Sequence, residues 1–337
     1  MAYAAFSPKG FKAWVIEETK TGQSAGTLDS PAITSGLLQL DVDSVAYPSI
    51  APNQNVDVRT GVGRVAHKND FYQDNVIRVT EVSLSGTYHN DTGHILLMQS
   101  ACGVNLDATV ADVEMPTAST TVSGKYGESE ANKTFTLVLA PPDTADGYNI
   151  VMVGCLCTNF TISADTGTEG GIYKWSATIS TGMKPITNNT TTEAGTAYTS
   201  APISINTLTG ATTVNSIAST VLSSFSVSVD SPAVYSGFLA NGYHTYGRAP
   251  ELAVTADVQV KYDSVTRPIL NNFNAQSAAD EAGMLTLTQA TANNCSIAIG
   301  AGVLTNAALS EGDIMMMDVS IKAVNVGNNI IAFDLAA

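Results

Sequence analysis

Apolar and polar residues alternate from Val254 to Tyr262, where every second residue is Val, Ala or Tyr and the residues between are Thr, Asp, Gln and Lys. A period of two directs one set of side chains to a buried face and the other toward water, so this segment is predicted to be a half-buried β-strand. The next stretch, "SVTRPILNNFNA", places Thr266 before Pro268 and sets three apolar side chains on one face. That pattern predicts a short capped helix.

The same strand-and-helix pattern occurs 174 positions earlier, where alternation from Val82 to Tyr88 is followed by "DTGHILLMQSA". A second match has an offset of 187: two alternating segments both end in Val-Asp-Ser, at Val42–Ser44 and at Val229–Ser231. We therefore interpret the chain as two copies of one small β-rich domain. The positions matched at the first offset are Tyr88 with Tyr262, Thr92 with Thr266, Ile95 with Ile269, Leu96 with Leu270 and Ala101 with Ala275.

Other apolar segments predict further strands. "TFTLVLAP" in the first half is matched with "CSIAIGAG" in the second, and "NNIIAFDLAA" predicts a last short strand. "NIVMVGCLC" and "IMMM" are apolar at consecutive positions, which predicts strands covered on both faces. "NFTISADTGTEGGIYKWSATIS" predicts a hairpin that turns at Gly170 and Gly171.

Residues 184–220 are poor in aromatic residues and rich in Thr, Asn, Ser, Gly and Ala, which indicates a connector, although "APISINTL" within it could add an edge strand. The predicted fold is all-β with one short helix per repeat. It consists of two tandem β-sandwich or half-barrel domains, at residues 1–183 and 221–337.

A long loop at about residues 48–75 interrupts the first half. Its segment "VDVRTGVGRV" alternates on both sides of Thr60 and Gly61, which predicts a projecting β-hairpin. One interpretation is a solvated loop. The other, which we favour because long ordered loops in compact domains are usually functional, is a contact arm that docks on an acidic neighbour. The basic side chains of this arm are Arg59, Arg64, His67 and Lys68.

The charge, the apolar runs and the cysteines of the chain argue against several kinds of partner and location. The chain has 15 Lys and Arg against 30 Asp and Glu, a formal net charge of −15, so the surface as a whole does not attract nucleic acid. The N-terminus lacks the apolar core of an export signal, and the longest apolar run, Ile150–Leu156, is too short to span a membrane. The four cysteines form no C-x2-C pair and are expected to be buried thiols.

We find no catalytic or cofactor motif: there is no G-x-S-x-G, P-loop or G-x-G-x-x-G sequence. His89, Asp91 and His94 could chelate a metal, but the second copy has Asp263 and Pro268 where the first has the histidines. The pairs of aspartates at 41 and 43 and at 143 and 146 are expected to be solvated. We therefore predict no catalytic residue, no metal site, no cofactor and no enzymatic activity.

The twofold β-domain, the short helix after a strand, the long early hairpin loop and the acidic balance resemble the tail tube (major tail) proteins of long-tailed bacteriophages. The likeness is carried by "CLCTNFTISADTGTEGGIYKWSATISTG" and "VLSSFSVSVDSPAVYSGFLANGYHTYGRAPELAVTADVQVKY". It covers 37–179 and 221–335. The doubled domain departs from the single-domain members, which form hexameric rings.

The resemblance implies homotrimeric rings with pseudo-sixfold symmetry, stacked into a tube in the virion tail after synthesis in the bacterial cytoplasm. It also implies contacts with terminator, tape measure and baseplate proteins, and passage of DNA through an acidic lumen without specific binding. Ring closure would pair the sheet edges that each copy leaves exposed. Two alternatives remain open: another virion ring or decoration protein, and a carbohydrate-binding β-sandwich module.

Overall fold

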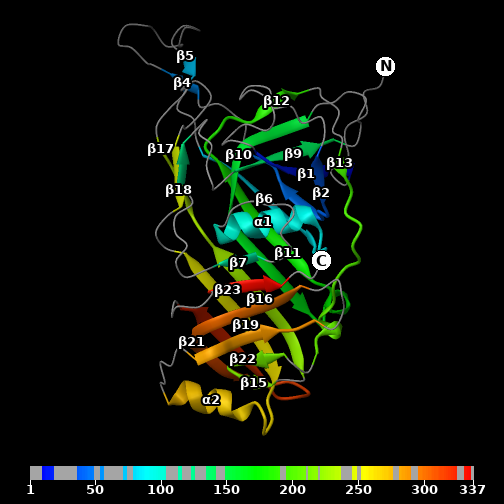
Figure 1. The fold of residues 1–337 in the computed structure, drawn as a ribbon, viewed down its shortest axis with the longest axis vertical. Helices are drawn as coiled ribbons and strands as arrows, with labels where there is room; N and C mark the ends of the chain where they lie inside the picture. Colours follow the sequence, from blue (N-terminus) through cyan, green and yellow to red (C-terminus); the bar gives the residue numbers. More distant parts are fainter. Residues whose placement is uncertain are drawn as a thin grey trace.

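The computed structural model of the protein is built mostly of β-strands, with two α-helices among the residues that it describes (Figure 1). No helix in the described part of the chain is both long and apolar enough to cross a membrane. The described residues are 10–18, 36–48, 54–56, 71–73, 79–103, 113–115, 123–125, 134–141, 149–189, 195–209, 212–218, 221–236, 245–248, 252–275, 281–289, 295–324 and 330–334.

Four strands of the first half lie side by side in the order β3–β6–β11–β10. They are β3 (Ser44–Ala46), β6 (Thr80–Thr87), β11 (Lys174–Thr181) and the second half of β10 (Asn149–Asp165), and each pair is antiparallel. Val, Leu, Ile and aromatic side chains alternate with Ser and Thr, so one face is buried and the other is polar. The predicted hairpin of β10 and β11 is confirmed.

Four strands of the second half repeat this order as β16–β19–β22–β21. They are β16 (Leu222–Asp230), β19 (Ala253–Lys261), β22 (Met316–Ala323) and the second half of β21 (Ser296–Ser310). β16 also pairs antiparallel with β10, with Phe160 opposite Val229 and Ile162 opposite Val227. The two sets therefore form one continuous eight-stranded antiparallel sheet.

The long strands β10 and β21 each leave this sheet in their first halves and enter a second layer. There β10 pairs with β9 (Phe135–Ala140), which pairs with β1 (Lys12–Glu17). In the same way β21 pairs with β20 (Glu281–Leu287), which pairs with β14 (Thr213–Val214). The first half of β10 is buried on both faces, as its uninterrupted apolar sequence predicts.

Helices follow β6 and β19 as predicted. α1 (Thr92–Cys102) is buried along almost its whole length and contacts β10, β7 (Val113–Met115), β2 (Leu37–Leu40) and β1. α2 (Arg267–Asn274) starts after Thr266, has a proline in its first turn and buries Ile269, so it is amphipathic. The predicted all-β fold with one short helix per repeat is therefore confirmed.

A β-bulge occurs at equivalent places in the two long strands. The register of β10 with β11 shifts at Thr158, and that of β21 with β22 shifts at Thr305. The hydroxyl of Thr158 donates to the carbonyl of Thr178 at 3.1 Å, and that of Thr305 donates to the carbonyl of Ser320 at 3.2 Å. Each threonine is followed by asparagine. The two halves therefore share this bulge as well as their strand order.

Three matches between the halves were wrong in detail. Ser44 of β3 lies opposite Ser85, and Ser224 of β16 lies opposite Gln259, which is the residue equivalent to Ser85. β3 therefore corresponds to the first part of β16, and the match of Val42–Ser44 with Val229–Ser231 was wrong. β9 corresponds to β20, since each pairs with the first half of a long strand, and not to "CSIAIGAG". Thr92 lies inside α1, whose N-cap is Asp91. Backbone pairing decides the first two matches and the position of the N-cap decides the third, and a short shared motif reveals neither.

The expectation for "IMMM" was also wrong. Met317 is buried, but Ile314 and Met315 are exposed in the turn before β22. An apolar run predicts burial on both faces only where another layer lies over it, and the described residues place none over this turn.

The largest hydrophobic cluster contains side chains from both halves, including Leu84 and Trp175 from the first and Val258 and Met317 from the second. The predicted connector contributes Ile203 and Ile205 to it. The predicted domain boundaries therefore fall within a single continuous core. The remaining described elements are β2 (Leu37–Leu40), β4 (Gln54–Val56), β5 (Phe71–Gln73), β7 (Val113–Met115), β8 (Ser123–Lys125), β12 (Ile186–Asn189), β13 (Gly195–Thr196), β15 (Ile217–Ala218), β17 (Ala233–Ser236), β18 (Thr245–Arg248), β23 (Ile331–Asp334), and the 3-10 turns η3 (Glu169–Gly171) and η4 (Ile205–Thr207).

Candidate assembly interface

The junction between the two repeats is made by strand edges. At Cys155, β10 has β9 on one edge and β11 on the other. Beyond that point β9 no longer pairs with β10, and the same edge of β10 pairs with β16 from Asn159 to Asp165. Ile162 and Val227 face each other on the core side of this junction, and both are buried. Backbone hydrogen bonding and apolar packing thus join repeat to repeat.

The same edge of β21 has no partner strand within the described part of the chain. At Gly302, β21 has β20 on one edge and β22 on the other, and beyond it only β22 continues. In the first repeat Ser163 pairs with Lys174, and in the second repeat Ser310 pairs with the equivalent residue, Met316. Leu309 comes just before Ser310 and therefore corresponds to Ile162, which comes just before Ser163. Leu309 is 42% exposed, whereas Ile162 is fully buried.

A second unpaired edge lies at the other end of the eight-stranded sheet. Within the described ranges β3 pairs with β6 alone, although β16, its equivalent, has partners on both edges. Tyr47 follows β3 at the position equivalent to Val227 and is 42% exposed. Burial nevertheless raises the pKa of the Tyr47 hydroxyl, and its ring meets Phe11 edge to face at 5.3 Å. Within the described residues the strands are arranged as a barrel, but no pairing joins β3 to β21.

The two unpaired edges are complementary. If the β10–β16 pairing were repeated between two copies, Leu309 of one copy would lie opposite Tyr47 of the next. Both are large apolar side chains, and both occupy positions that the internal junction buries. An exposed strand edge is a template for pairing with another chain, so these edges form a candidate assembly interface.

The basic contact arm predicted from sequence lies outside the described residues at all its named positions: Arg59, Thr60, Gly61, Arg64, His67 and Lys68. The structure does show β4 and β5 as an antiparallel pair on either side of this segment, with Val56 opposite Phe71. In Figure 1 this pair lies at the edge of the molecule, above β17 and β18. A hairpin therefore exists here, with its arms further apart in sequence than predicted.

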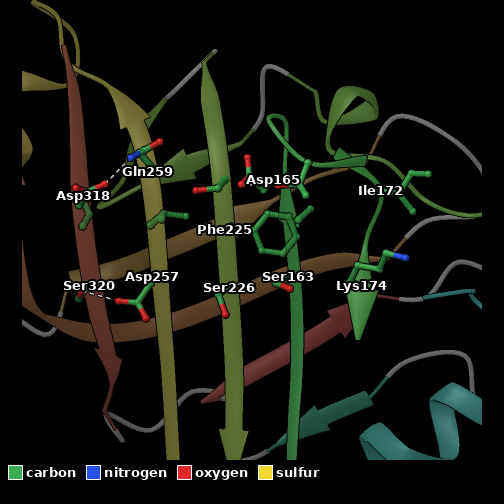
Figure 2. A pocket seen from close by; sticks show the side chains of 15 residues that line it. Ser163, Asp165, Ile172, Lys174, Phe225, Ser226, Asp257, Gln259, Asp318 and Ser320 are labelled. Atoms are coloured by element: carbon green, nitrogen blue, oxygen red, sulfur yellow. Dashed lines mark hydrogen bonds between the residues drawn. The ribbon is translucent and has the colours of Figure 1, made fainter. Parts of the chain in front are cut away.

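The polar face of the eight-stranded sheet is hollowed across the junction (Figure 2). The hollow has a volume of about 590 Å³ and spans β11, β10, β16, β19 and β22. The side chain of Gln259 donates to Asp318 at 2.8 Å, and the hydroxyl of Ser320 donates to Asp257 at 2.6 Å. Its ionisable lining residues are Asp165, Asp257, Asp318 and Lys174. The face is therefore concave, hydroxyl-rich and net negative.

The predicted connector is tied to the first repeat beside α1. The ring of His89 contacts the Asp41 carboxylate at 2.9 Å and the Ser200 carbonyl at 2.7 Å. The Asp91 carboxylate accepts the backbone N–H of Ser200 at 3.1 Å. The sequence suggested a metal site for His89 and Asp91 and a solvated position for Asp41. In the structure these three side chains instead hold residues 198–202 in place. The described residues contain no cluster of metal-ligating side chains.

His94 and the four cysteines are buried. His94 packs against Trp175 and Tyr88, with ring centroids at 5.2 and 5.4 Å. Burial, helped by nearby His89, lowers the pKa of His94 to about 3, so the ring is neutral. All four cysteines are buried, as predicted, and burial raises the pKa of Cys155 well above its usual range.

No protein-family model matches this chain, and no curated protein sequence matches it at a significant level. Its function must therefore be argued from its own residues.

Proposed function

We propose that the protein is a structural virion protein that assembles head to tail into closed rings, which stack into a phage tail tube. The observation that carries this proposal is the β10–β16 junction, because the chain already contains one copy of the contact that it would make with its neighbour. A contact between two different surfaces generates a ring or a filament. Three copies would place six repeats around one axis, in agreement with the resemblance to duplicated tail tube proteins.

The concave polar face is the surface that would line such a ring. A closed wall has its concave side toward the axis, and the apolar side of this sheet is covered by the second layer and α1. Small hydroxyl side chains with a net negative charge would repel phosphate and offer no base-stacking platform. Duplex DNA could then pass without being held.

The basic arm is proposed as the contact between stacked rings. Its base, the β4–β5 pair, lies at the edge of the molecule, above β17 and β18 (Figure 1). Four basic side chains on a chain of net charge −15 would find an acidic surface on any adjoining copy. Tape measure, terminator and baseplate proteins would be the other partners in a tail.

The test is assembly of the purified chain and of a variant at the sheet edge. We expect the wild-type protein to form rings or tubes in electron micrographs. Leu309→Asp would bury an unpaired carboxylate at the junction and should weaken association roughly 100-fold, measured by sedimentation. Val234→Asp is the matched control, because Val234 is 55% exposed and belongs to β17, which pairs with β18 in a separate sheet, so it should assemble normally.

Two results would contradict the proposal. Wild-type protein that remains monomeric at high concentration would remove ring formation altogether. Leu309→Asp protein that assembles as readily as wild type would show that the free edge of β21 is not the contact.

A further inference from the structure

The second repeat carries a group of exposed apolar side chains where β21 turns into β22. Val265, Ile314 and Met315 are 55%, 60% and 46% exposed, and Val221 beside them is also exposed. Backbone hydrogen bonds from Tyr262 to Met315 and from Lys261 to Val221 bring these segments together. We call these four residues (Val221, Val265, Ile314 and Met315) the apolar corner.

The equivalent place in the first repeat is covered. The backbone N–H of Tyr88 donates to the carbonyl of Tyr173 at 2.9 Å, as that of Tyr262 donates to Met315 at 2.9 Å. Tyr173 is therefore the counterpart of Met315. Tyr88 and Tyr173 are both fully buried, whereas Tyr262 is half-buried and Met315 is exposed.

The cover in the first repeat is the chain's own connector. The backbone N–H of Tyr173 donates to the carbonyl of Ile203 at 2.8 Å, and Ile172 forms an antiparallel bridge with Ser204. Ile203 and Ile205 are buried against the first repeat by this contact. An extended, mostly uncharged segment thus closes this end of the sheet.

By its order along the chain, the counterpart of that segment is the stretch that precedes β1. The connector leads into β14, where Val214 lies opposite Leu285. The N-terminal segment leads into β1, where Val15 lies opposite Leu137, the equivalent of Leu285. Ile205 precedes Val214 by nine positions, and Phe6 precedes Val15 by the same nine. The first six residues, "MAYAAF", are uncharged and apolar, as a cover for this corner requires.

We propose that residues 1–9 of a second copy lie across the apolar corner of the first, adding their backbone at Ile314 and Met315. This inference rests on the proposed head-to-tail pairing, which brings the first repeat of one copy against the second repeat of another. Figure 1 shows β1 and α2 toward opposite ends of the long axis, so the corner is distant from the β1 of its own chain. Each copy would thereby give its neighbour the contact that the connector makes within the chain.

Crosslinking between two singly substituted chains tests this contact. Ala5→Cys and Ile314→Cys proteins are mixed, allowed to assemble, oxidised, and separated on a non-reducing gel. We expect a dimer band in the mixture that disappears on reduction, because the bridge can form only between chains. The natural cysteines are buried and should give little background. Ala5→Cys mixed with Leu252→Cys is the matched control, since Leu252 is exposed elsewhere.

The outcomes separate this inference from the proposed function. Rings or tubes in the Ala5→Cys and Ile314→Cys mixture without a crosslink would overturn the N-terminal contact and leave ring formation standing. Absence of both assembly and crosslink, with wild type also monomeric, would overturn both. A variant lacking residues 1–9 should need roughly tenfold more protein to assemble, and unchanged assembly would also count against the contact.

Discussion

His94 is a buried base that makes no hydrogen bond through either ring nitrogen within the described part of the chain. Its neighbours are the rings of Tyr88, His89 and Trp175, so the site accepts a neutral ring and resists a charged one. Because the pKa of His94 is lowered from 6.5 to about 3, the folded state does not take up the proton that the unfolded chain binds below pH 6.5. Stability from this residue is complete above pH 6.5 and is lost as pH falls toward 3.

His94→Phe should remove this pH dependence. Between pH 6.5 and pH 5, wild type should lose about 2 kcal/mol of unfolding free energy because of His94, since each pH unit corresponds to about 1.4 kcal/mol. The variant should not show this loss. Urea unfolding of both proteins at pH 7.5 and pH 5 measures the difference, with carboxylate effects common to both. Equal losses in the two proteins would show that His94 is protonated in the folded state.

Buried residues on alternating strands are the part of the site that residue patterns predict well. The burial of Phe160, Ile162, Tyr173 and Trp175 follows from a period of two, and the burial of the cysteines follows from their apolar surroundings. The roles of Asp41 and Asp91 could not be predicted in this way. Their partners His89 and Ser200 come from other segments, and only the fold brings them together.

At the scale of the element, the matched bulges at Thr158 and Thr305 are the clearest structural correspondence between the two halves. The extra residue bends each long strand as it passes from the second layer into the eight-stranded sheet. The shared Thr-Asn pair was the available sequence signal, but two residues are too few to identify a bulge without its pairing partner.

Thr158→Val and Thr305→Val test whether the two bulges are equivalent. Each variant keeps the side-chain shape and removes one hydroxyl donor to a carbonyl, at Thr178 or Ser320. We expect a loss of about 1 kcal/mol for Thr158→Val and less for the exposed Thr305→Val, measured by chemical unfolding. Thr255→Val, exposed on β19, is the control; a larger loss there than at Thr158 would contradict this role.

At the scale of the whole molecule, charge and curvature act together on the concave face. Asp257 and Asp318 point into the hollow beside Ser320 and Gln259 (Figure 2). Asp165 also contributes negative charge, but its carboxylate accepts the N–H of Gly167 at 2.7 Å and so shapes the turn after β10. The first two aspartates can therefore be changed with less effect on the fold.

Replacing both Asp257 and Asp318 with Lys should turn a surface that repels DNA into one that holds it. We expect assembled variant protein to retain a short labelled duplex at low salt and to release it at high salt, whereas wild type retains none. The Asp→Asn pair is the control for loss of charge alone and should bind far less than the Lys pair. Wild-type assemblies that retain DNA equally well would contradict an acidic conduit.

The sequence by itself determined the strand faces, the helix after β6 and β19, the repeated plan and the buried thiols, because each depends on residues close together in the chain. The tertiary structure alone decided the register of the repeats, the β10–β16 junction, the unpaired edges at Leu309 and Tyr47, and the uncovered corner at Met315. These depend on which distant backbone segments pair, and local hydrophobic patterns are satisfied equally well by many pairings.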